Sequence, residues 1–116
     1  MHYEKLREAC LSLPHVTEDF PFDQHTLVMR VGNKIFAFLP LEKTPAQISL
    51  KMTPENVLET RAQYPAVEPG WHLNKKFWNQ VIMDGSIDPE IIGGWIKDSY
   101  GLIFASLPKK VQAELQ

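Results

Sequence analysis

The hydrophobic pattern of the chain begins with a helical period. Apolar residues recur every three to four positions over residues 3–13, and Pro14 cannot continue a helix, so the first helix is predicted there. The apolar stripe consists of Tyr3, Leu6, Cys10 and Leu13. Cys10 is the only cysteine of the chain, and its place on this stripe predicts a small buried side chain rather than a reactive thiol.

Between residues 26 and 52 the pattern changes to the period of β-strands. Residues 27–31 and 34–39 are rich in strand-forming side chains and flank Gly32-Asn33, a dipeptide that suits a two-residue hairpin turn. Residues 46–52 alternate apolar and polar side chains, which is typical of a half-buried strand. We therefore predict an antiparallel three-stranded meander over residues 26–52.

Two later helices are predicted from their first residues. Thr53-Pro54-Glu55 and Asp88-Pro89-Glu90 each combine an N-cap side chain, a proline at the first helical position and an acid near the positive end of the helix dipole. The first of these helices runs to about residue 63, and the second is predicted to be the core helix. Its apolar stripe consists of Ile91, Ile92, Trp95, Ile96, Leu102 and Ile103. Residues 80–83 are predicted as a strand, and Pro108 as the start of a short terminal helix.

Composition and charge narrow the possible functions. The 116 residues, 44% hydrophobic and 22% charged, are expected to form a single globular domain, 1–116. A net charge of −2 argues against general affinity for nucleic acid, so any such binding has to be local. Lysine pairs occur at Lys75-Lys76 and Lys109-Lys110. A cytoplasmic protein is expected, since no membrane-spanning apolar run, no signal peptide and only one cysteine are found.

Sequence motifs of enzymes are missing. No phosphate-binding glycine pattern follows a predicted strand, and no serine stands in a nucleophile elbow. The four histidines show neither HxH nor HExxH spacing. The chain is therefore expected to be non-enzymatic, with no cofactor and no metal site.

The segment 69–78, PGWHLNKKFW, carries the candidate chemistry. It brings together two lysines, a histidine and three aromatic residues behind a Pro-Gly turn. Lysines among aromatics can hold phosphates and stack on bases. The same residues can equally anchor a loop, with Trp71 and Trp78 directed into the protein.

Five segments resemble the MmcQ/YjbR family in order and spacing. They are residues 13–22, 31–37, 48–51, 69–79 and 98–100. The resemblance implies an α+β fold, with helices packed on an antiparallel β-sheet as a two-layer sandwich, similar to the bacterial frataxin-like CyaY proteins. It also implies a DNA-binding activity through a double-wing arrangement. The chain departs from the family pattern with Trp71 in place of tyrosine, Phe77 in place of histidine, and Asp23-Gln24-His25 in place of a glycine-containing turn.

Three hypotheses follow from these residues and from the resemblance. The first is non-enzymatic DNA binding, with Lys75 and Lys76 on phosphates, His72 as a hydrogen-bonding partner and the hairpin turn as a wing. Its candidate residues are Asn33, Lys34, Trp71, His72, Asn74, Lys75, Lys76 and Trp78. The second is a module that binds an acidic protein or an anionic small molecule with the same surface. The third, raised only by the frataxin-like fold, is iron binding by surface carboxylates.

Overall fold

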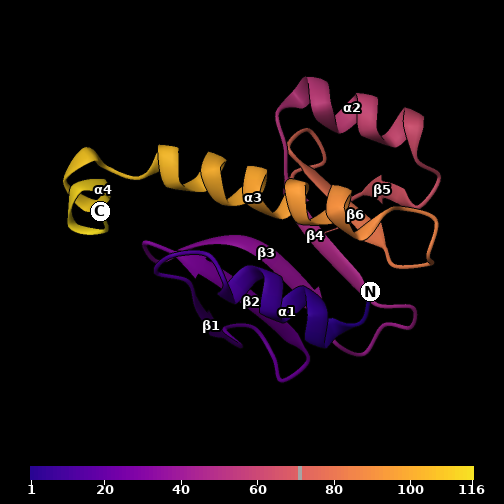
Figure 1. Cartoon of the computed structure of the whole chain (residues 1–116), viewed down its shortest axis with the longest axis horizontal. Coiled ribbons are helices and arrows are strands. Elements are labelled where there is room, and N and C mark those ends of the chain that lie inside the picture. Colours follow the sequence, from indigo (N-terminus) through magenta and orange to yellow (C-terminus); the bar gives the residue numbers. More distant parts are fainter. Residues whose placement is uncertain (71) are drawn as a thin grey trace.

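The computed structural model describes residues 1–70 and 72–116, and Figure 1 shows how its elements are arranged. A six-stranded sheet in the order β1-β2-β3-β4-β6-β5 forms the centre, and every neighbouring pair of strands is antiparallel. The strands are β1 (Thr17–Asp19), β2 (Thr26–Val31), β3 (Lys34–Pro40), β4 (Gln47–Lys51), β5 (Val67–Pro69) and β6 (Trp78–Ile82). The helices are α1 (Tyr3–Leu11), α2 (Pro54–Gln63), α3 (Pro89–Ser106) and α4 (Lys109–Glu114). The α+β class and the antiparallel sheet are as predicted.

The helices α1, α2 and α3 cover one face of the sheet. The helix α3 packs across β2, β3 and β4 and contacts α1, whereas α2 packs on β5 and β6 (Figure 1). The core lies between this helical layer and the sheet. Its fully buried side chains include Leu6, Phe36, Leu39, Ile48, Leu50 and Ile96.

The predicted meander is confirmed by β2, β3 and β4. Gly32 and Asn33 form the turn between β2 and β3, with φ of 57° and 68°, a conformation that glycine and asparagine tolerate best. A Cβ atom at Gly32 would lie 2.6 Å from a methyl carbon of Leu107, so the turn is also packed closely against the end of α3.

A β-bulge changes which side chains of β3 face the core. Met29 pairs with Ala37 and Arg30 pairs with Ile35, which leaves Phe36 without a partner in β2. Phe36 and the next residue, Ala37, are both completely buried. As a result, Phe38 lies on the opposite face of the sheet from Phe36, although the two are separated by only one residue.

The sheet is weakly joined between β3 and β4. Only two residue pairs connect these strands, Ala37 with Leu50 and Phe38 with Ser49. Ser99 of α3, with no exposed surface, bridges the strands where the pairing stops. Its hydroxyl donates to the Phe36 carbonyl at 2.6 Å and accepts from the Lys51 N–H at 2.9 Å. The serine thus links the carbonyl of Phe36 on β3 to the N–H of Lys51 on β4, the next pair of residues in the register of these strands.

Two boundaries, two short strands and one core assignment differ from the sequence predictions. The helix α1 ends at Leu11 rather than at residue 13, β6 starts at Trp78 rather than at residue 80, and the short strands β1 and β5 were not predicted. The buried apolar stripe of α3 is narrower than predicted. Of the six residues predicted for it, only Ile92, Ile96 and Ile103 are buried. Trp95 is only partly buried and packs edge-on against Tyr64 of the segment after α2, with ring centroids 5.3 Å apart.

Cys10 is predicted to be unreactive in the folded protein. It is fully buried in α1, and this burial raises the pKa of its thiol to about 12, compared with about 8.5 for a free cysteine. We expect a thiol-specific disulfide reagent to label Cys10 at neutral pH only after denaturant is added. Because the folded pKa is the higher one, this thiol contributes stability below about pH 8.5 that is lost as the pH rises toward 12. Rapid labelling of the native protein would contradict this.

Candidate nucleic-acid interface

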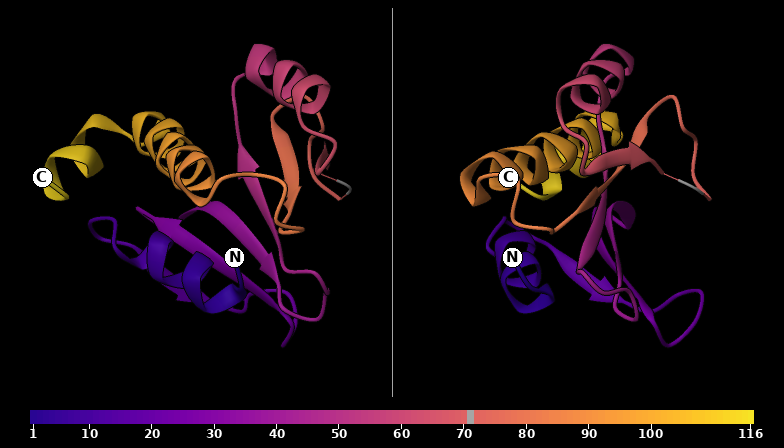
Figure 2. Two further views of the ribbon diagram at one scale, coloured as in Figure 1. Left: turned by 45° about the vertical axis from the view of Figure 1, so that its right-hand side comes forward. Right: turned by 90° about the vertical axis from the view of Figure 1, so that its right-hand side faces the viewer.

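The face of the sheet opposite α1 and α3 is open, and two loops flank it. Figure 2 (right) shows the loop between β1 and β2 and the segment between β5 and β6 projecting to the side away from these helices. Between the loops lies a hollow of about 180 Å³. It is lined by Thr26, Phe38, Pro40, Ser49, His72, Leu73 and Gln80. We call this surface, from Phe22 to Phe77, the open face.

The segment before β6 is fixed by a partly buried arginine–asparagine contact. Arg61 of α2 donates from Nε to Asn79 Oδ1 at 2.6 Å, and its Nη2 donates to the carbonyls of Lys75 at 2.5 Å and Trp78 at 3.2 Å. Asn79 is completely buried and donates in turn to the Val57 carbonyl at 3.2 Å. These bonds tie α2 to the lysine-bearing segment and determine where its backbone lies.

Local hydrogen bonds shape the tip of the same segment. The Asn74 side-chain oxygen accepts from the Lys76 N–H at 3.0 Å, and the Asn74 carbonyl accepts from the N–H groups of Phe77 and Trp78. Phe77 is joined to the end of β4, because its carbonyl accepts from the Met52 N–H at 2.8 Å. The side chain of Asn74 therefore holds the turn on which Lys75 and Lys76 are displayed.

Phe77 gathers two positive charges at one end of the open face. The ammonium groups of Lys51 and Lys76 each lie 5.7 Å from the centroid of its ring. The negative face of an aromatic ring attracts such cations. Lys51 and Lys76 are far apart in the sequence, yet their ammonium groups lie no farther apart than twice this 5.7 Å separation from the ring centroid.

Aromatic rings continue across the open face from this charged end. Trp78 meets Phe38 edge-on at 5.3 Å, and Phe38 stacks on Phe22 at 6.3 Å with an angle of 19° between the rings. Phe22 belongs to the loop between β1 and β2, and 66% of it is exposed. The row therefore runs from a half-buried tryptophan to a ring that is open to solvent.

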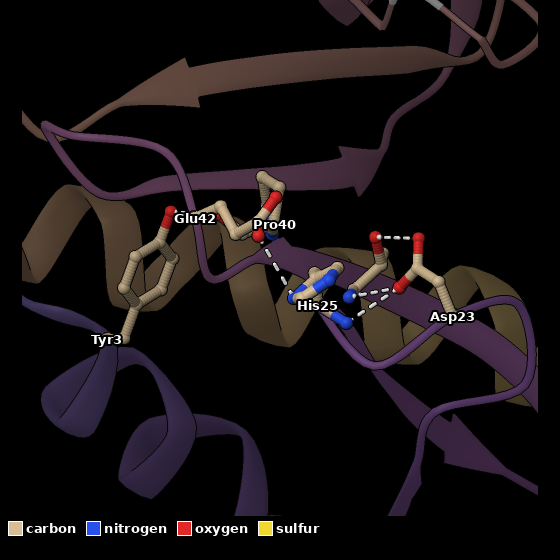
Figure 3. Close-up of polar contacts among 6 residues, drawn as sticks. Tyr3, Asp23, His25, Pro40 and Glu42 are labelled. Carbon is tan, nitrogen blue, oxygen red and sulfur yellow. Dashed lines mark hydrogen bonds and ion pairs between the residues drawn. The ribbon is translucent and has the colours of Figure 1, made fainter.

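The loop that carries Phe22 is held at its base by polar contacts (Figure 3). Asp23 Oδ1 accepts from the N–H groups of His25 and Thr26 at 2.8 and 2.7 Å, and these bonds lower the pKa of Asp23. His25 Nδ1 lies 3.1 Å from Glu42 Oε1 in the neighbouring loop. The loop is thus attached to the end of β3 and to the β3–β4 connection.

Comparison with known proteins identifies the family to which this chain belongs. The family model described as YjbR matches residues 11–102. The chain belongs to the YjbR family.

Its relatives match along nearly their whole length. "Uncharacterized protein YbdF" of Escherichia coli O157:H7 is 31% identical over 98% of this chain and 93% of its own, and "Uncharacterized protein YjbR" of E. coli K12 is 31% identical over 95% and 93%. The crystal structure of the Deinococcus radiodurans protein DR2400, a DUF419 domain, superposes with a TM-score of 0.93 at 38% identity and covers 98% of this chain and 87% of its own. A Pseudomonas syringae protein superposes with a TM-score of 0.75 at 27% identity, over 88% and 98%.

The YjbR-family structure brings together only some of the residues predicted from the sequence. His72, Asn74, Lys75, Lys76 and Trp78 lie in or beside one segment at the open face, where His72 lines the hollow and both lysines are exposed. Trp71, the remaining predicted residue of this segment, lies outside the described residues.

Asn33 and Lys34 lie elsewhere, at the β2–β3 turn. The Lys34 ammonium lies 3.5 Å from the Ser106 carbonyl, which places this turn beside the C-terminal end of α3 (Figure 1). The structure therefore does not bring the predicted hairpin wing next to the lysine-bearing segment.

Sequence reasoning missed Phe22, Phe38, Ser49, Lys51 and Gln80 as members of this surface. The alternation of residues 46–52 did place Ser49 and Lys51 on the polar face of a strand. This alternation was the sequence signal that could have identified Ser49 and Lys51. Only the sheet order, in which β4 neighbours β6, shows that the polar side of β4 lies next to Phe77.

Two adjacent acidic residues of this YjbR-family chain, Glu18 and Asp19, form ion pairs with arginines. Glu18 points to α1, where Arg7 donates to it from Nε at 2.7 Å and lowers its pKa. Asp19 points to the other face and accepts from Arg30 Nε at 2.7 Å. Among the described residues, no group of three or more His, Cys, Asp or Glu could hold a metal ion.

Two larger grooves in the described part of the chain lie outside the open face. One measures about 580 Å³ and is bounded by α2 and α3, with Glu59, Lys97 and Asp98 among its charged lining. The other measures about 650 Å³ and lies between the start of α1 and the β3–β4 connection, with Glu4 and Lys43 among its lining. Within residues 1–70 and 72–116, no helix is long and apolar enough to cross a membrane.

Proposed function

We propose that this protein binds DNA without catalysing a reaction, and that the open face is its contact surface. The observation that carries the proposal is the placement of two ammonium groups, those of Lys51 and Lys76, around the ring of Phe77. In a chain with a net charge of −2, such a local concentration of cations is what phosphate binding requires. Lys75, exposed in the same segment, adds a third cation.

The shape of the surface supports this proposal. The two loops stand on either side of the strands, so a strand of nucleic acid lying between them would meet the lysines at one end and the aromatic row along the floor. Phosphate contacts would fix the position of the strand, and side chains of the floor would meet its bases. We propose that the flanking loops, rather than the β2–β3 turn, act as the wings.

The alternative partner is an acidic protein or an anionic small molecule bound by the same lysines. The hollow of about 180 Å³ is smaller than the roughly 300–1,000 Å³ of usual small-ligand sites. The groove between α2 and α3 carries the carboxylates Glu59 and Asp98 against the single ammonium of Lys97, a balance of charge that disfavours an anion. These two observations favour a partner that lies along the surface over a small anionic ligand, and the binding experiment separates DNA from an acidic protein.

A charge-reversal pair tests the proposal. Lys75→Glu with Lys76→Glu is expected to weaken DNA binding roughly tenfold or more and to flatten the slope of log K against log salt by about 1.8, at 0.9 for each lost phosphate contact. Both side chains are exposed, so the fold should be retained. Fluorescence anisotropy over a salt series measures the affinity, and circular-dichroism melts measure the folding.

The chain contains a matched control for this variant. Lys109→Glu with Lys110→Glu makes the same change in charge on α4, where both lysines are exposed beyond the end of α3. This control should bind DNA almost as the wild type does. Equal losses in the two variants would reduce the effect to net charge, and wild-type protein that binds neither duplex nor single-stranded DNA at low salt would refute the proposal. Heparin binding with the same slope and no DNA preference would favour the acidic partner.

A further inference from the structure

We infer that the open face takes single-stranded DNA, with an unpaired base in the hollow beside Ser49 and another base on the ring of Phe22. This inference rests on the proposed DNA binding and specifies its substrate. Bases of a duplex are stacked on each other and paired, so their faces are hidden from a protein ring. A single strand leaves both the faces and the pairing edges of its bases accessible.

The hollow has the size and lining for one base. Its volume of about 180 Å³ is below that of sites for larger ligands, and Phe38 forms an apolar wall to it. Ser49 lines the hollow and is only 6% exposed. Its hydroxyl makes no hydrogen bond to another described residue and is not among the buried unsatisfied groups, so its oxygen is accessible from the hollow. A base edge in the hollow would find this hydroxyl available for a hydrogen bond.

Phe22 offers a second contact, of a kind that suits any base. One face of its ring stacks on Phe38, and 66% of the residue remains exposed, so the outer face is available for a further ring. The loop beneath it is fixed by the bonds of Asp23 and by the contact of His25 with Glu42 (Figure 3). A solvent-exposed aromatic residue on a held loop is a stacking platform of the type used for single strands.

The phosphate contacts lie at a matching distance from the hollow. Ser49 and Lys51 are two residues apart on the same face of β4, which separates them by about 7 Å. A base bonded to Ser49 therefore places its own backbone beside the ammonium groups of Lys51 and Lys76. The lysines at one end of the open face match the phosphates of a single DNA strand, and the aromatic row matches its bases, which are attached to the backbone at short intervals.

Three fluorescent probes test the inference: a short oligodeoxythymidine, an abasic strand with the same number of phosphates, and a duplex of the same length. We expect the oligodeoxythymidine to bind the wild type more tightly than either of the others. Phe22→Ala should weaken this binding by about fivefold to about 150-fold, the effect of one lost stacking contact, without changing the abasic strand. Ser49→Ala should weaken it by about twofold to about tenfold, the effect of one hydrogen bond.

Phe20→Ala is the matched control for Phe22→Ala. Phe20 is also exposed and lies two residues earlier, but it makes no ring contact with another described aromatic residue. Its affinity for the oligodeoxythymidine should stay close to that of the wild type. Circular-dichroism melts of all three variants confirm that each one is folded.

The outcomes separate this inference from the proposed function. Equal binding of the abasic strand and the oligodeoxythymidine would overturn the inference and leave phosphate-based DNA binding standing. Tighter binding of the duplex, or equal effects of Phe22→Ala and Phe20→Ala, would also overturn the inference alone. If none of the three probes binds at low salt, both the inference and the proposed function fail.

Discussion

Replacement of Ser99 by alanine is expected to lower the free energy of unfolding by about 2 to 6 kcal/mol, because it leaves two buried backbone groups without partners at about 1 to 3 kcal/mol each. These groups are the Phe36 carbonyl at the bulge and the Lys51 N–H at the end of β4. Neither can find water, since Ser99 has no exposed surface. The change removes one oxygen atom, so lost packing accounts for little of the effect.

Ser106→Ala is the control on the same helix. Its hydroxyl donates only to the Ile103 carbonyl one turn earlier, and the residue is exposed, so a change within about 0.5 kcal/mol is expected. Urea denaturation followed by circular dichroism measures both variants. Amide exchange adds a local readout, because the Lys51 N–H should lose its protection in Ser99→Ala. Equal stabilities of the two variants would show that Ser99 does not join the strands.

Replacement of Asn79 by leucine is expected to cost about 2 to 4 kcal/mol, although the two side chains are similar in size. Asn79 is fully buried and satisfies both Arg61 Nε and the Val57 carbonyl, and leucine can satisfy neither. An unpartnered group of this kind costs about 1 to 3 kcal/mol, with more for a charged donor. The loss also frees Arg61, which holds the backbone of the lysine-bearing segment.

Asn56→Leu provides the comparison for this variant. Asn56 is exposed on α2 and its side chain makes no hydrogen bond to another described residue, whereas its backbone N–H donates to the capping Thr53 side chain. The same substitution there should change the stability by less than about 0.5 kcal/mol. Denaturant melts give the free energies, and anisotropy tests whether Asn79→Leu also weakens DNA binding more than its folded fraction explains. A stable Asn79→Leu protein would contradict the bonding described for Arg61.

The elements that were correctly predicted are those with strong local signals. The caps of α2 and α3 form as their residue types require: Thr53 Oγ1 accepts from the Asn56 N–H, and Asp88 Oδ1 accepts from the Glu90 N–H. The turn at Gly32-Asn33 also depends only on its own residues. By contrast, β1 and β5 have three residues each, too few to show a period, and they are strands only because β2 and β6 offer them an edge.

The candidate site was predictable where it is contiguous in sequence and not where it is assembled by the sheet. The lysines and the histidine of residues 72–76 were found from their composition. Lys51 and Phe38 could not be placed beside them, because the first depends on the pairing of β4 with β6 and the second on the bulge at Phe36. A strict alternation along β3 would have put Phe38 in the core.

Lys51 takes part in both layers of the molecule at once. Its backbone N–H is bonded to Ser99 beneath the sheet, whereas its ammonium group lies over Phe77 on the other side. Linkage makes any coupling through this residue reciprocal: if a ligand on the ammonium stabilises the attachment of α3, loosening α3 weakens that ligand by the same free energy. Lys51 is thus a residue at which the helix on one side of the sheet and the candidate binding surface on the other are physically joined.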